Sequence, residues 1–111
     1  MAKYMWLFSY TSEAAARMID NPGDRAAATA KLAEAVGGTL ECFYWMMGPY
    51  DGVAIVDVPD VSAAAGVSLG IAAGGALKSL EGHQLVTMDE AMAALEAGKS
   101  VREVYQLPGT K

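Results

Sequence analysis

The sequence lacks the residues that several kinds of functional site require. Of its 111 residues, one is a cysteine, Cys42, and one is a histidine, His83. An intramolecular disulfide is therefore excluded, and so is a structural zinc site, which takes four Cys or His ligands. Gly-x-Gly-x-x-Gly, P-loop and nucleophile-elbow motifs are absent as well. We expect no metal and no other cofactor.

Basic residues are also few, since 8 Lys and Arg stand against 13 Asp and Glu, for a formal charge of −5. Nucleic acids and anionic membrane surfaces attract basic footprints, so we expect neither as a partner. The uncharged run at residues 61–77 is rich in Gly and Ala and short of the ~20 strongly apolar residues of a membrane span. The N-terminus lacks a signal-peptide pattern, and we expect a cytoplasmic protein.

What the sequence does contain is apolar residues, at 53%, with 19% charged. This composition excludes disorder, and the length corresponds to one domain. Alanine is the commonest residue, which favours close helix packing without a pocket in the helix-side core. We expect one domain over residues 1–98 and a tail over residues 99–111, packed on the domain or on a neighbouring subunit.

Hydrophobic alternation and turn residues predict the elements in order. Strands are expected at residues 4–10, 39–47, 53–58 and within 77–86, where Gly82 indicates a bulge. Helices are expected from Ser12 to Val36 with a break at residues 21–23, at 62–73, and at 88–97 with a Thr87–Glu90 capping box. The order is an α+β, ferredoxin-like βαββαβ arrangement with an extra C-terminal helix and tail, in which the second and third strands form an antiparallel hairpin.

The first strand places its aromatic residues on one face and Met5 and Leu7 on the other. We assign Met5 and Leu7 to the side of the helices, so that the aromatic row lies on the open face of the sheet. A row of exposed aromatic side chains forms a larger apolar patch than a monomer usually exposes, which predicts a homodimer or higher oligomer. The aromatic row consists of Tyr4, Trp6, Phe8 and Tyr10.

The same aromatic row, with Phe43 and Trp45 of the second strand, is also a candidate ligand pocket. Two interpretations remain open and are compatible with each other. The rings line a site between subunits for a planar, apolar metabolite, or they only form the subunit interface, where Tyr and Trp are enriched.

One segment carries a family resemblance. Gly48-Pro49-Tyr50-Asp51 follows the strand ECFYWMMG, and LAEAVGG precedes that strand at residues 32–38. From about Tyr4 to Leu95 the chain resembles the GYD-domain family of small bacterial proteins, named for a Gly-x-Tyr-Asp signature. The resemblance implies a ferredoxin-like, dimeric α/β barrel. It implies little about activity, because the family is largely uncharacterised.

Three residues are candidates for catalysis, each with a plain structural alternative. Imidazole exchanges protons near neutral pH, and Glu81 lies two residues before His83 on the same strand face, as an acid–base pair requires. Tyr50 and Asp51 form a phenol–carboxylate pair. Alternatively, His83 is an ordinary surface residue, and Tyr50 and Asp51 only stabilise a turn. Cys42 is expected to be a buried, unreactive thiol.

Three functions therefore stay open. The first is a homo-oligomeric α/β-barrel protein that binds a small apolar or aromatic molecule at the sheet and subunit interface. The second is a cofactor-independent oxygenase or isomerase on the same fold, in which His83 or Tyr50 and Asp51 move protons. The third is a structural or regulatory assembly module.

Overall fold

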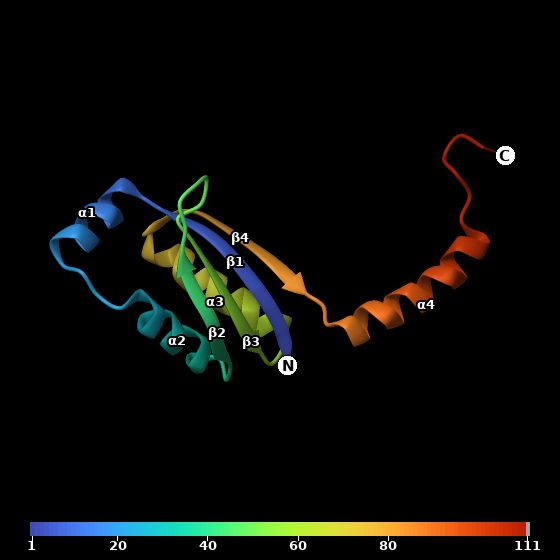
Figure 1. Ribbon diagram of the computed structural model, residues 1–111, viewed down its shortest axis with the longest axis horizontal. Coiled ribbons are helices and arrows are strands. Elements are labelled where there is room, and N and C mark those ends of the chain that lie inside the picture. Colours follow the sequence, from blue (N-terminus) through green and yellow to red (C-terminus); the bar gives the residue numbers. More distant parts are fainter. Residues whose placement is uncertain (111) are drawn as a thin grey trace.

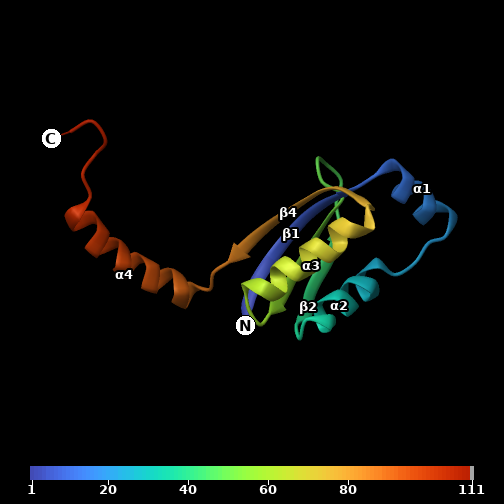
Figure 2. The same cartoon turned by 180° about the vertical axis from the view of Figure 1, so that it is seen from behind.

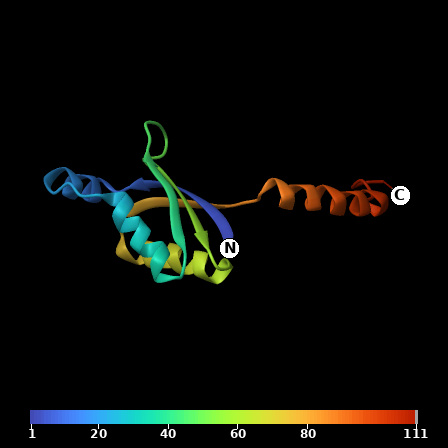
Figure 3. The same cartoon turned by 60° about the horizontal axis from the view of Figure 1, so that its bottom comes forward.

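The computed structural model describes residues 1–110 as a four-stranded sheet with two helices on one face and two more at its ends (Figure 1). Figure 2 looks onto the face that the helices cover, and Figure 3, which sees the sheet closer to edge-on, shows both covering helices on the same side of it. In chain order the elements are β1 (Ala2–Tyr10), α1 (Ser12–Asp20), α2 (Arg25–Ala35), β2 (Thr39–Trp45), β3 (Gly52–Val58), α3 (Val61–Gly74), β4 (Leu77–Leu85) and α4 (Met88–Val104).

The strands run in the order β2-β3-β1-β4, and every neighbouring pair is antiparallel. This is the predicted α+β, ferredoxin-like arrangement, and the predicted β2–β3 hairpin is confirmed. The break predicted at Asn21-Pro22-Gly23 is confirmed, and it divides the helical segment into α1 and α2. α2 packs mainly on β2 and α3 mainly on β4, while the two helices contact each other little.

The helix starts follow from side-chain capping. Asp24 and Asp60 accept hydrogen bonds from the backbone N–H groups of Ala27 and Ala63, which satisfies donors that the first turn leaves unpaired. The Thr87–Glu90 capping box is present as predicted. For α1 the cap is Thr11, one residue before the predicted Ser12.

The last helix is longer than predicted. It passes through Gly98 and ends at Val104, so the expected stop at Gly98 is wrong. A glycine inside a helix costs only about 1 kcal/mol relative to alanine, and the helical residues on both sides outweigh that cost. The boundary expected at residue 98 therefore falls inside α4. This helix extends away from the sheet, and none of its residues is buried (Figures 1 and 3).

The faces of the sheet are the reverse of the prediction. Tyr4, Trp6 and Phe8 are buried beneath the helices, and Trp6 is only 5% exposed. The indole Nε1 of Trp6 donates a hydrogen bond to Ser68 Oγ of α3, at 3.1 Å. Met5 and Leu7, expected under the helices, lie on the open face. The core joins Tyr4 and Trp6 to small and branched residues: Ala33, Val56, Val58, Ala64 and Val67.

Volume explains the reversal. Helices whose inward positions are alanine and a few branched residues cannot fill a core by themselves, so the sheet must supply the large side chains that bring the interior to normal packing density. Glycines on neighbouring strands make room for these rings. A Cβ at Gly52 would lie 2.4 Å from Phe8 Cζ, and one at Gly82 would lie 3.0 Å from Trp6 Nε1. Gly82 pairs regularly with Trp6, so the bulge expected there is absent.

The uncharged run at residues 61–77 forms α3, the turn after it and the start of β4. α3 ends at Gly74 and is capped by Gly75, whose φ of +71° belongs to the left-handed region that glycine adopts without strain. Its Ala64 and Val67 are buried against the sheet. Over residues 1–110, the helices fall short of the length and apolarity that crossing a membrane demands.

Candidate functional site

Between the sheet and the two covering helices lies an apolar cavity of about 90 Å³. Four of the six residues predicted to form a ligand pocket line it: Trp6, Phe8, Tyr10 and Phe43. Of the other two, Tyr4 belongs to the core cluster, and Trp45 faces grooves at the surface. The expectation that the helix-side core holds no pocket is therefore wrong, because α2 and α3 pack on opposite edges of the sheet and leave room between them.

The aromatic rings of the cavity pack on one another. The Phe8 ring lies 5.6 Å from the centroids of both Tyr10 and Phe43. The helices add Leu32, Val67 and Ile71, so almost the whole lining is apolar. Cavities lined in this way stay dry and accept apolar molecules.

Two polar residues of α2, Arg25 and Thr29, complete the lining. The Thr29 hydroxyl donates a hydrogen bond to Arg25 O at 2.8 Å, within the helix. Sequence reasoning missed both residues. The pattern that could have found them is the spacing of Arg25, Thr29, Leu32 and Ala33, which lie on one helical stripe that faces the sheet.

An outer groove of about 430 Å³ adjoins the cavity and shares Tyr10, Arg25 and Ala76 with it. The groove also contacts Arg17 of α1 and the Asn21-Pro22-Gly23 turn. The break between the two helices thus folds α1 back so that it borders the mouth of the cavity. Sequence reasoning identified the break but not its effect.

The open face of the sheet is apolar along its centre. Met5 lies between Ile55 and His83 of the neighbouring strands, and Leu7 lies between Val53 and Glu81. These four apolar side chains are partly exposed, since no helix covers them. We call Met5, Leu7, Val53 and Ile55 the apolar strip. Cys42 of β2 pairs with Ile55 and is partly exposed, not buried as predicted.

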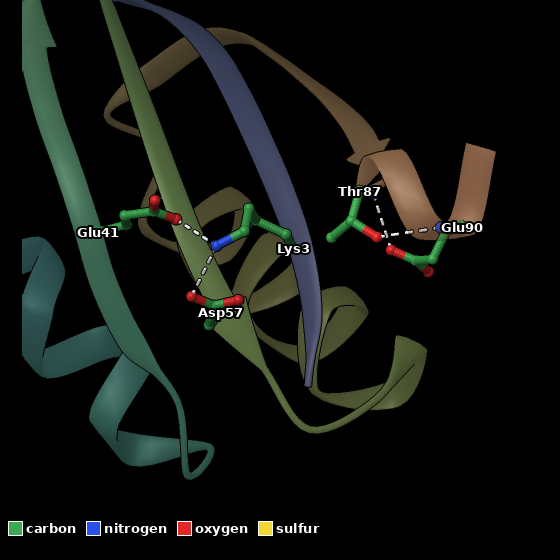
Figure 4. A network of polar contacts seen from close by, with 5 residues as sticks. All are labelled: Lys3, Glu41, Asp57, Thr87 and Glu90. Carbon is green, nitrogen blue, oxygen red and sulfur yellow. Dashed lines mark hydrogen bonds and ion pairs between the residues drawn. The ribbon is translucent and has the colours of Figure 1, made fainter. Parts of the chain in front are cut away.

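Charged side chains close one end of the apolar strip. Lys3 of β1 forms ion pairs with Glu41 of β2 and Asp57 of β3, at 2.5 and 3.1 Å (Figure 4). The hydrogen bond to Glu41, and then that to Asp57, raise the pKa of Lys3 above 10.5. The network ties three strands together at their solvent-exposed side.

Beside the apolar strip, on its β4 side, Glu81 and His83 come together with Tyr50 of the β2–β3 loop. The Tyr50 hydroxyl donates a hydrogen bond to Glu81 Oε2, and His83 Nε2 lies 2.9 Å from Glu81 Oε1. The bond from Tyr50, and then that from His83, hold the pKa of Glu81 below its ordinary 4.5. The bond to Glu81 raises the pKa of Tyr50 above 10.0. A neutral imidazole that donates through Nε2 keeps Nδ1 as a proton acceptor, the arrangement of a general base.

Asp51, the third catalytic candidate, is held away from this cluster by backbone contacts. Its Oδ2 accepts a hydrogen bond from Tyr10 N at 2.8 Å, and its own N–H donates to Phe8 O. The β2–β3 loop is thereby fastened to the end of β1, where Ser9 is buried beneath it. Gly48, with a φ of +149°, provides the turn. Asp51 positions the loop that carries Tyr50.

Comparison with known proteins agrees with this architecture. A family model described as the GYD domain matches residues 4–95. No curated protein matches the chain.

Solved structures share the fold at low identity. The crystal structure of FFRP-DM1 is 13% identical, with a TM-score of 0.53 over 78% of this chain and 100% of that one. TTHA0845 from Thermus thermophilus is 20% identical, with a TM-score of 0.52 over 78% and 95%. At3g17210 from Arabidopsis thaliana is 13% identical, with a TM-score of 0.50 over 78% and 95%.

Proposed function

The chain belongs to the GYD domain family, and we propose that it binds a small apolar or aromatic molecule in the helix-side cavity and associates with a second copy through its open face. The aromatic lining of the cavity carries the proposal of binding. Ligand sites are concave and mostly apolar, with a few polar groups that orient the ligand. Here Trp6, Phe8 and Phe43 provide the apolar walls, and Arg25 and Thr29 provide the polar groups at the rim.

The size of the cavity supports a small ligand. Its volume of about 90 Å³ is several times the ~10–15 Å³ that one water molecule needs. It accommodates one small apolar group, while the rest of a ligand lies in the outer groove of about 430 Å³. The pocket belongs to one chain, so binding does not depend on the second copy.

Benzyl alcohol is a suitable neutral probe, with binding measured by calorimetry and by the NMR signal of the Trp6 indole N–H. We expect saturable binding that Val67→Phe abolishes, because Val67 lines the cavity and a phenyl ring there fills it. Leu69→Phe is the matched control, because Leu69 lies on the same helix and is 72% exposed. Absence of saturable binding, or equal binding by Val67→Phe, contradicts the proposal and leaves an assembly module as the function.

Self-association is supported by apolar surface that nothing covers. In an antiparallel sheet with one solvated face, the residues on that face are usually polar. The apolar strip departs from this rule over β1 and β3. α4 also exposes large apolar residues, among them Met88, Met92 and Leu95. A second copy seated on the open face would cover the strip and the cluster of Tyr50, Glu81 and His83.

That cluster supports a second candidate function, proton transfer to or from an enolisable or phenolic substrate. The observation behind it is the single carboxylate of Glu81 that contacts both a phenol and an imidazole. Deuterium incorporation at the α-carbon of cyclohexanone, followed by NMR, tests it. We expect His83→Gln to abolish a protein-dependent rate and Lys78→Gln, on the same strand, to leave it unchanged. No rate above buffer contradicts this second function.

A further inference from the structure

The outer groove beside the cavity brings together two of the three arginines of the chain, Arg17 and Arg25. From this placement we infer that the ligand is a small aromatic or short-chain carboxylate, with its apolar end in the cavity and its carboxylate between the two guanidinium groups. The inference rests on the proposed binding function and names the chemical class of the ligand. It does not depend on self-association.

The outer groove is lined by two positive side chains, whereas the whole chain has a formal charge of −5. Within residues 1–110, neither Arg17 nor Arg25 forms an ion pair with a carboxylate. Of the acidic residues next to them in sequence, Asp24 uses its carboxylate to cap α2 through Ala27 N, and neither Asp24 nor Asp20 lines the groove. Two positive groups are therefore available to an anion at this point.

Arginine is also the side chain suited to a carboxylate. Its planar guanidinium presents parallel N–H donors that match the two oxygens of a carboxylate. Arg25 lines both the cavity and the outer groove, whereas Arg17 lines the groove alone. A ligand that fills the cavity and extends into the outer groove would therefore lie against Arg25 and end near Arg17.

The cavity is apolar and the outer groove is positively charged, and this difference decides which end of the ligand enters the cavity. An unpaired carboxylate inside the aromatic cavity would lose its hydration without compensation, so the charge stays outside. The cavity admits only a small group such as a phenyl ring or a short alkyl chain, because its volume is about 90 Å³. Phenylacetate has this composition, and phenylacetamide is its uncharged counterpart of nearly the same shape.

Calorimetric titration of the full chain with phenylacetate and phenylacetamide tests the inference. We expect the acid to bind about tenfold or more tightly than the amide, as charge-assisted hydrogen bonds to arginine provide. Arg25→Gln and Arg17→Gln should each remove most of that difference. Arg102→Gln is the control, since Arg102 lies on α4 and lines neither hollow. Circular dichroism confirms that each variant is folded.

The outcomes separate this inference from the proposed function. If the acid and the amide bind equally, or if the Arg17 and Arg25 variants keep the preference for the acid, the carboxylate assignment is wrong and the apolar pocket stands. If neither probe binds and benzyl alcohol also fails, both are wrong. Preference for the acid that is lost in Arg25→Gln and kept in Arg102→Gln supports the inference.

Discussion

The two faces of the sheet come from the same alternating strands and have different surroundings. On the helix side, large aromatic rings meet alanine-rich helices and enclose a cavity. On the open side, the Lys3 ion pairs lie at one end of the apolar strip, and the cluster of Tyr50, Glu81 and His83 lies beside it. The helix face holds the buried core of the monomer, whereas the apolar side chains of the open face stay partly exposed within one chain. Substitutions on the helix face should therefore change the stability of the monomer, and substitutions on the open face should change its association.

The largest effect is expected on the helix face. Trp6→Ala removes a ring that is 5% exposed and should lower the free energy of unfolding by about 3–5 kcal/mol. Chemical denaturation followed by circular dichroism measures the loss. Tyr44→Ala on the open side is the control, because Tyr44 is 65% exposed and should cost well under 1 kcal/mol. Equal costs at the two positions would contradict the contrast between the faces.

A charge on the apolar strip should break association and leave the fold intact. Ile55→Asp places a carboxylate at the centre of the open face, where a second copy would bury it without a partner. We expect a loss of about 100-fold or more in dimer affinity, measured by sedimentation. Leu69→Asp, on the outer side of α3, should sediment as the unmodified chain does. An unmodified chain that sediments as a monomer at every concentration refutes self-association.

Glycine-to-alanine substitutions test the packing of the helix face, because each adds a single methyl group. Gly52→Ala places a Cβ 2.4 Å from the Phe8 ring, and overpacking of this kind costs about 1–3 kcal/mol. Gly66 on α3 has no atom within 4 Å of its Cβ position, and Gly66→Ala should stabilise the chain by about 0.5–1 kcal/mol. Thermal unfolding of both variants gives the sign of each effect. A stabilised Gly52→Ala would show that the Phe8 ring does not lie where we place it.

The smallest effect concerns acid pH. The pKa of Glu81 in the folded chain lies below its ordinary value of 4.5 because of the bonds from Tyr50 and His83. Its contribution to stability is therefore present above pH 4.5 and is lost as the pH falls through the folded pKa. Tyr50→Phe removes the larger cause, so the NMR titration of Glu81 should move back toward 4.5. An unchanged titration means that the Tyr50 bond does not form in solution.

Local chemistry made much of the fold predictable. Short apolar runs bounded by turn residues located all four strands, and alternation assigned their side chains to two faces. Asp24 and Thr87 marked helix starts, because their oxygens satisfy first-turn N–H groups. The end of α4 was not predictable in this way, since a single glycine does not stop a helix that its neighbours continue.

The candidate site was predictable only in pieces. Glu81 and His83 share a strand face, and alternation alone placed them together. Their contact with Tyr50, which is 31 residues from Glu81, depends on the loop that Asp51 fastens to Tyr10 N. Arg25 lies on a helical stripe with Thr29 and Leu32, but no local pattern connects it with Arg17. The two arginines border one groove because the chain reverses between α1 and α2.

The sequence alone located the strands and most of the helix starts, showed which residues share a face, and excluded the chemistry that a single cysteine and a single histidine cannot support. The tertiary structure decided which face of the sheet became the interior. Alternation is symmetric and cannot distinguish the two sides of a strand. The volume that the alanine-rich helices leave unfilled breaks the symmetry, because only the rings of Tyr4, Trp6 and Phe8 are large enough to fill it.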